Sequence, residues 1–132
     1  MSYNDIKLRP TDTQFSNYIR EKAKWRCEYC NKLCKVGNEW IAKLEASHYM
    51  GRRKESTRFD PDNVYSLCFT CHKKLGGYTR NEDGEYDLFV KRKLGEQRYR
   101  ALILRGNLSG KRDDFMTKLY IKQLFIDLRK TN

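Results

Sequence analysis

Two pairs of closely spaced cysteines constrain the fold of this chain more than any other feature. Cys27 and Cys30 form the first Cys-x-x-Cys pair, and Cys68 and Cys71 form the second. One such turn directs two thiolates at a metal ion, and two turns complete the tetrahedral four-sulfur site that suits zinc. The sequence therefore predicts a structural Zn²⁺ that joins two segments far apart in the chain.

Other interpretations of the cysteines stay open at this point. The thiols can be unconnected buried or free groups, and Cys34, the fifth cysteine, can replace Cys30 or be a small buried residue. The segment from Cys68 to His72 also fits a c-type haem attachment motif. Haem attachment would require an oxidising compartment, and the N-terminus has no apolar run typical of a secretory signal. We expect the protein to be cytoplasmic, where paired cysteines indicate metal more often than disulfides.

The charge of the chain indicates a polyanionic partner. Its 132 residues carry a formal net charge of +11 and are only 39% hydrophobic. A charge of this size repels itself in the compact state, and nucleic acid is the most common polymer that neutralises it. No segment approaches the roughly 20 apolar residues that span a bilayer, so we expect no membrane partner. A basic protein without a nucleic-acid ligand is the alternative.

The chain has two histidines, and both lie in or beside the segment that the cysteine pairs enclose. His48 is followed by Asn63 and then by His72, directly after Cys71. A histidine can take a proton from water near neutral pH, and Mg²⁺ or Mn²⁺ can stabilise charge on a scissile phosphate. These residue types fit the needs of phosphodiester hydrolysis. The alternatives are that His48 is structural and that His72 binds zinc in place of a cysteine.

His48, Asn63 and His72 between zinc-binding cysteine pairs resemble the motif of the HNH endonucleases. The segments 45–53, 58–64 and 67–72 are similar to the phage NinG (Rap) recombination proteins, and the similarity covers about residues 27–104. A looser similarity connects the chain to phage recombination endonuclease VII. The resemblance implies a zinc-stapled ββα-metal core, with two strands, a loop and a helix around one divalent cation.

The resemblance also implies a role for each residue of the motif. His48 would be the general base, Asn63 would tether the loop and orient the base, and His72 would bind the catalytic metal. The substrate would be DNA, either duplex or branched as in recombination, and the products would carry 5′-phosphate and 3′-hydroxyl ends. A nicking endonuclease of ordinary duplex DNA is an alternative within the same family.

Ser47 departs from the family pattern. Most members carry Asp or His directly before the general base as a second metal ligand, whereas a hydroxyl is a weak ligand for a hard cation. Coordination would then depend on His72, phosphate and water, since Mg²⁺ accepts few protein ligands when phosphate supplies the rest. This departure favours a second hypothesis, a zinc-stapled DNA-binding module without catalytic activity.

Basic residues near the motif are candidate DNA ligands. They lie in the loop between the expected strands and in the expected helix after them: Arg52, Arg53, Lys54, Arg58, Lys73 and Lys74. Guanidinium and ammonium groups in such places bind phosphates on either side of a scissile bond. A loop that only confers solubility is the alternative.

Hydrophobic periodicity and breaker residues predict an α+β fold. We expect helices over about 11–25, from His72, over 86–95, from there to Gly106, and over about 114–129, with strands within 40–49 and 63–67. We expect one domain over 1–132, made of an N-terminal helix region (1–26), the zinc-bound core (27–77) and a helical C-terminal region (78–132). The last helix has a wide apolar side. Because a symmetric junction needs two active sites, we expect a homodimer through the C-terminal helices.

Overall fold

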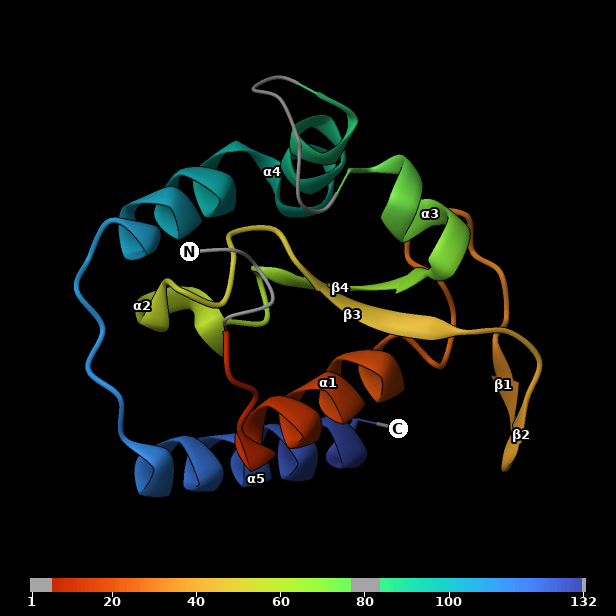
Figure 1. The fold of residues 1–132 in the computed structure, drawn as a ribbon, viewed down its shortest axis with the longest axis horizontal. Coiled ribbons are helices and arrows are strands. Elements are labelled where there is room, and N and C mark those ends of the chain that lie inside the picture. Colours follow the sequence, from red (N-terminus) through yellow and green to blue (C-terminus); the bar gives the residue numbers. More distant parts are fainter. Residues whose placement is uncertain (1–5, 77–83, 132) are drawn as a thin grey trace.

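The computed structural model describes residues 6–76 and 84–131, and its fold is of the predicted α+β class, with helices and two small antiparallel sheets among these residues (Figure 1). The elements in chain order are α1 (Pro10–Lys22), β1 (Lys35–Val36), β2 (Glu39–Trp40), β3 (Leu44–His48), α2 (Glu55–Arg58), β4 (Val64–Cys68), α3 (Phe69–Lys74), α4 (Glu85–Gly106) and α5 (Asp114–Lys130).

Strands β3 and β4 lie at the centre of the molecule. They pair antiparallel, with His48 opposite Val64 and Leu44 opposite Cys68. Helix α1 packs on one face of this pair with α5 behind it, and α4 lies over the other face (Figure 1). The register brings the end of β3, with His48, next to the start of β4, while the cysteine end of β4 lies beside the start of β3.

Each face of the β3–β4 pair contributes to its own apolar core, because successive side chains of a strand point to opposite faces. Val64 packs with Phe15 and Ile19 of α1 and with Ile121 of α5. Tyr65 and Leu67 pack on the other side with side chains of α4 and with the cysteines; the buried α4 members are Tyr86, Phe89, Val90 and Leu102. The central strands are therefore held from both sides.

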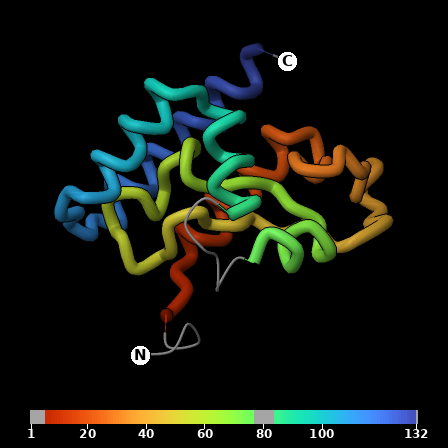
Figure 2. The backbone as a smooth tube through the Cα atoms, turned by 90° about the horizontal axis from the view of Figure 1, so that it is seen from above, coloured from red at the N-terminus to blue at the C-terminus, as the bar shows by residue number. Residues whose placement is uncertain are grey.

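The segment around Gly37 contains a small hairpin. Strands β1 and β2 pair with Lys35 opposite Trp40 and Val36 opposite Glu39, around a turn in which Gly37 has φ +57°. Positive φ suits glycine in a two-residue hairpin turn. Seen from above, this hairpin and its flanking segments project on the side away from α4 and α5 (Figure 2).

Helix boundaries agree with the sequence patterns in most places. The predicted break at Gly95 is confirmed, since Gly95 has φ +77° and ψ 168° inside α4. Helix α1 ends at Lys22, before the predicted end near Trp25, because Lys24 and Trp25 both have positive φ. A short helix, α2, lies in the segment 50–62, for which no helix was predicted. Among the described residues, no helix is long and apolar enough to cross a membrane.

Candidate functional site

The structure brings the four predicted zinc ligands together. The Sγ atoms of Cys27, Cys30, Cys68 and Cys71 all lie within 4.8 Å of one another, and those of Cys30 and Cys68 are 3.9 Å apart. Four sulfurs around a zinc ion at about 2.3 Å would be separated by about 3.8 Å. Cys34 lies outside this group, and the five cysteines are free thiols. The cluster fits a tetrahedral metal ion such as zinc.

Backbone hydrogen bonds shape both cysteine turns. The N–H of Cys30 donates to Sγ of Cys27, and the N–H of Cys71 donates to Sγ of Cys68, each at 3.5 Å. Cys68 is also the N-cap of α3. A metal held here would fix the start of α3, and with it the position of His72, relative to the segment that follows α1.

His48 is the last residue of β3, and its imidazole has one defined hydrogen bond. Nε2 lies 2.9 Å from the backbone carbonyl oxygen of Arg58. Because a carbonyl only accepts, Nε2 carries the proton, which leaves the lone pair on Nδ1. Nδ1 is buried and has no hydrogen-bond partner among the described residues. Burial, followed by the charge of Arg52, lowers the pKa of His48 to about 4. The ring is thus a neutral imidazole with an available proton-accepting nitrogen.

The prediction that Arg58 is a surface ligand of phosphate is wrong, because its side chain is buried. It is 4% exposed, and its guanidinium donates to Asp12 at 3.0 and 2.6 Å and to the carbonyl oxygens of Lys7 and Arg52. Burial acts to raise the pKa of Asp12, but the hydrogen bonds from Arg58 and the Arg9 backbone, with the nearby positive charges, outweigh burial and lower it. Arg58 therefore acts inside the protein, as the partner of a buried carboxylate.

Asn63 is fully buried and connects both ends of the segment 50–62. Its side-chain oxygen accepts from the Met50 N–H at 2.7 Å, and its amide nitrogen donates to the carbonyls of Met50 at 2.8 Å and Thr57 at 3.0 Å. The same segment carries Arg58, whose carbonyl contacts His48. The amide thus restrains the backbone that positions the histidine.

His72 lies on α3, beside a carboxylate of β3. Its Nδ1 is 3.5 Å from Oε1 of Glu45. Glu45 did not stand out in the sequence, although strand alternation places it on the same face of β3 as Ser47, two residues before it. Ser47 itself is 1% exposed, and its hydroxyl lies 2.8 Å from that of Tyr86. The carboxylate beside His72 is therefore a stronger candidate ligand for a hard cation than the hydroxyl of Ser47.

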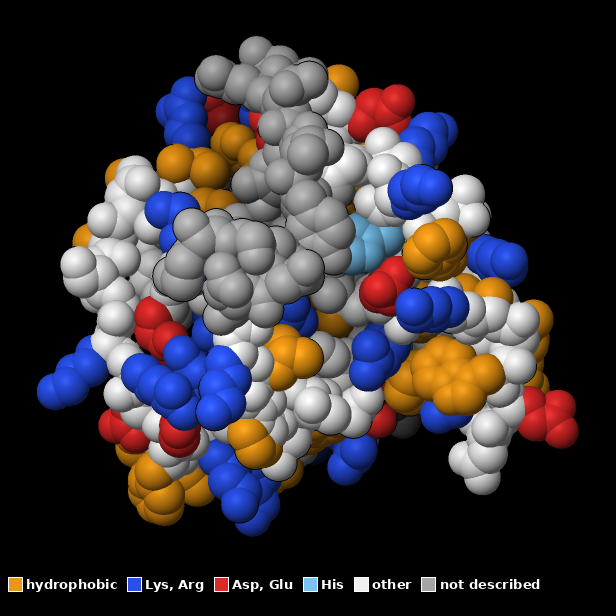
Figure 3. All heavy atoms as spheres, viewed as in Figure 1, with side chains coloured by type: hydrophobic (Ala, Val, Ile, Leu, Met, Phe, Trp, Pro, Cys, Tyr) orange, Lys and Arg blue, Asp and Glu red, His pale blue; other side chains and the backbone are white. Residues whose placement is uncertain are grey.

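The predicted DNA-binding residues fall into two groups. Arg53, Lys54, Lys73 and Lys74 are exposed. Arg52 is half-buried, with Nε 3.6 Å from Asp12, and Arg58 is buried. Figure 3 shows Lys and Arg side chains on the face on which a histidine is visible. The exposed group can reach a ligand, whereas Arg52 and Arg58 support the loop from inside.

Comparison with known proteins adds one finding. The family model described as HNH endonuclease matches residues 27–77. This range begins at Cys27 and includes both cysteine pairs, β3, α2, β4 and α3. No curated protein and no solved structure matches the chain.

Proposed function

Since residues 27–77 match the family model described as HNH endonuclease, we propose that this protein is a metal-dependent DNA endonuclease with His48 as its general base. The observation that carries the proposal is the state of the His48 ring. Its proton is directed to a backbone carbonyl, and its second nitrogen is buried without a partner among the described residues. A general base needs this combination of a fixed orientation and an available lone pair.

The proposed reaction uses His48 as follows. Nδ1 removes a proton from a water molecule, and the water oxygen attacks the phosphorus of a DNA phosphodiester. The bond from phosphorus to the 3′ oxygen breaks, and the 3′ oxygen takes a proton from solvent, which leaves 5′-phosphate and 3′-hydroxyl ends. The carbonyl of Arg58 accepts the Nε2 hydrogen bond throughout, and therefore stabilises the imidazolium that forms.

His72 and Glu45 would hold the catalytic divalent cation. One imidazole and one carboxylate suit Mg²⁺ or Mn²⁺, for which phosphate and water complete the coordination. The bound ion would supply charge stabilisation at the phosphate and at the leaving oxygen. Ser47 is left out of this set because its hydroxyl contacts Tyr86. The zinc-binding cluster would have the separate task of fixing the start of α3.

Exposed cations would place the DNA. Arg53 and Lys54 precede α2, while Lys73 and Lys74 lie on α3 beside His72. Contacts of this kind fix the position of a duplex through its phosphates and carry little sequence information. The overall charge of +11 supports the same class of substrate.

Branched DNA of the recombination type is the substrate we propose within this class, in a bacterial cytoplasm infected by or carrying a phage. The five free thiols suit a reducing compartment. We treat residues 1–132 as one domain, because both apolar cores include residues of β4. A nickase of ordinary duplex DNA would share the same chemistry.

A homodimer through α5 would supply two active sites for a symmetric junction. The part of α5 that faces solvent carries apolar side chains, with Phe115 71% and Met116 57% exposed. Such a surface suits a self-complementary interface. Sedimentation of the protein with and without junction DNA tests this; a monomer under both conditions removes the dimer.

The second candidate function is a DNA-binding module without catalysis, and the buried hydroxyl of Ser47 favours it. One experiment separates the two. Supercoiled plasmid and a four-way junction are offered side by side with Mg²⁺, Mn²⁺ or EDTA. Metal-dependent cleavage supports the nuclease, and religation of the products by DNA ligase tests their ends. Binding of both DNAs without cleavage supports the second function.

A further inference from the structure

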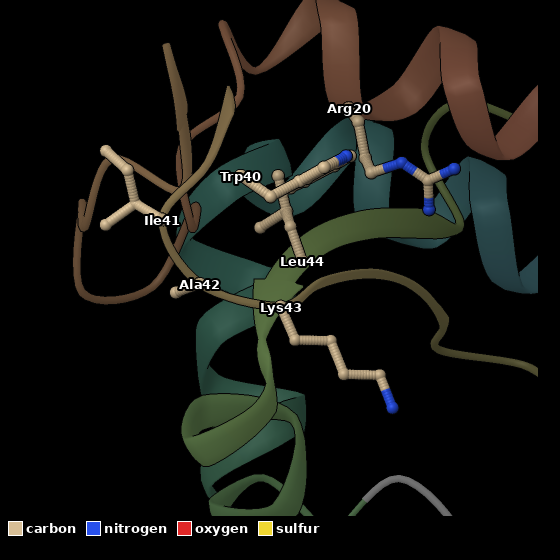
Figure 4. A pocket seen from close by; sticks show the side chains of 6 residues that line it. All are labelled: Arg20, Trp40, Ile41, Ala42, Lys43 and Leu44. Atoms are coloured by element: carbon tan, nitrogen blue, oxygen red, sulfur yellow. The ribbon is translucent and has the colours of Figure 1, made fainter. Parts of the chain in front are cut away.

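The β1–β2 hairpin and its flanks expose large apolar side chains that no part of the described chain covers. Trp40 is 53%, Ile41 59% and Val36 55% exposed. An open pocket of about 480 Å³ lies here, between the hairpin, the start of β3 and the last turn of α1. Figure 4 shows the Trp40 side chain extending toward the base of the Arg20 side chain, whose guanidinium group points away from Trp40, while Lys43 points away from both. Its lining residues are Arg20, Trp40, Ile41, Ala42, Lys43 and Leu44.

Positive charges accompany the aromatic rings of this surface. Nζ of Lys35 lies 4.2 Å from the ring centre of Trp25 and 5.0 Å from that of Trp40. Nζ of Lys43 lies 5.6 Å from the ring of Phe69, which is 54% exposed. The lining residues of the pocket include two cations and no acid. Nε of Arg20 is buried and has no hydrogen-bond partner in the part of the chain that the structure describes.

We propose that this surface, which we define as Arg20, Lys35, Trp40, Lys43 and Phe69, binds unpaired nucleotides of the DNA substrate. Exposed aromatic rings that alternate with cations are the features by which proteins bind single strands, since every base has a stacking face and every nucleotide a phosphate. A paired base presents no free face to such a ring. The proposal rests on the proposed nuclease function and specifies its substrate as DNA with an unpaired segment.

The length of β3 gives the distance between this surface and His48. Lys43 directly precedes β3, and His48 ends it, so five residue steps at about 3.3 Å each separate Lys43 from His48 by roughly 17 Å. At about 3.4 Å per nucleotide of duplex, this corresponds to roughly five nucleotides. Phe69 lies on the same helix as His72, three residues before it. The surface therefore adjoins the proposed site, and cleavage is expected a few nucleotides from the point where strands separate.

The test measures binding in a His48→Ala background, so that no DNA is cut. The probes are a labelled oligo(dT) single strand and a duplex of the same length. We expect Trp40→Ala and Phe69→Ala each to weaken oligo(dT) binding by at least about fivefold, with little change for duplex. Trp40→Phe keeps a stacking ring and should retain most of the affinity. Phe115→Ala on α5 is the matched control for loss of an exposed ring.

A fluorescence readout separates stacking from a structural effect. Trp25→Phe leaves Trp40 as the sole tryptophan, because the chain contains two, and its emission should be quenched by oligo(dT). The proposal would be overturned if Trp40→Ala and Phe69→Ala both left the oligo(dT) affinity unchanged. It would also be overturned if these substitutions changed only the self-association of the protein. If oligo(dT) binding depends on Trp40 but no DNA is cut by the wild type, the nuclease proposal fails while this site stands. If the wild type cuts DNA and neither Trp40→Ala nor Phe69→Ala weakens oligo(dT) binding, the nuclease proposal stands while this binding site is refuted.

Discussion

Nε2 of His48 lies 2.9 Å from the backbone carbonyl oxygen of Arg58, which joins the end of β3 to helix α2. The Arg58 side chain is held by Asp12, and the neighbouring carbonyl of Thr57 is held by Asn63. The orientation of one imidazole therefore depends on a buried ion pair and on a buried amide, through the backbone of residues 57 and 58. This arrangement connects the stability of the fold to the proposed chemistry.

The first prediction concerns the pH dependence of His48. Burial, and then the charge of Arg52, lower its pKa to about 4. We expect an NMR titration of His48 to show a midpoint near 4, well below the usual value of about 6.5. Because the folded pKa lies below the unfolded one, the free energy of unfolding should decrease as pH falls from about 6.5 toward 4. A His48 midpoint near 6.5 would contradict the buried, neutral state. NMR is preferred because acid also releases zinc from thiolates.

We expect Cys71→Ser and Cys34→Ser to differ in bound zinc and in thermal stability. Cys71→Ser should lose the bound zinc and the cooperative thermal transition, because zinc binding is part of the folding free energy of such sites. Cys34→Ser is the control, since Cys34 lies outside the four-sulfur group. Elemental analysis should find one zinc per chain in the wild type and in Cys34→Ser. Zinc lost from Cys34→Ser and kept in Cys71→Ser would refute the assignment.

The buried pair of Asp12 and Arg58 should contribute strongly to stability. Asp12→Asn leaves the guanidinium without its charged partner, which typically costs about 3–5 kcal/mol when the pair is buried. Glu96→Gln removes a partner from the exposed Arg100–Glu96 pair, whose side chains are each 75% exposed, and should cost less than about 1 kcal/mol. Urea unfolding monitored by fluorescence measures both. Equal effects would show that burial of the Asp12 pair is not what stabilises it.

Sequence patterns predicted the parts of this fold that depend on local spacing. The Cys-x-x-Cys turns, the break at Gly95 and the central strands all follow from residues close together in the chain. Arg58 could not be placed in this way, because a loop arginine is usually exposed and its buried partner lies 46 residues earlier. Glu45 was missed for a similar reason, since its proximity to His72 arises only when β3 and α3 pack together.

The proximity of Glu45 and His72 predicts a measurable effect on metal affinity. Glu45→Gln should weaken Mn²⁺ binding to the DNA-free protein by roughly tenfold or more, because Glu45 would be a direct ligand and even the outer partners of a ligating histidine typically contribute that much. Zinc content should not change. Glu39→Gln removes an exposed acid from β2 and serves as the matched control. Calorimetric titration provides the readout, and the same Mn²⁺ affinity in Glu45→Gln and wild type would remove Glu45 from the proposed site.

The central claim is that His48 acts as the general base of a metal-dependent DNA endonuclease, and cleavage by wild type and His48→Ala tests it most directly. Both proteins are assayed on supercoiled plasmid and four-way junction with saturating Mg²⁺ or Mn²⁺, after zinc content and thermal unfolding are shown to match. We predict that the wild type cuts at least one of the DNAs only when metal is present, and that His48→Ala is slower by roughly 100-fold or more. Equal cleavage by both proteins, or no metal-dependent cleavage by the wild type, would contradict the claim.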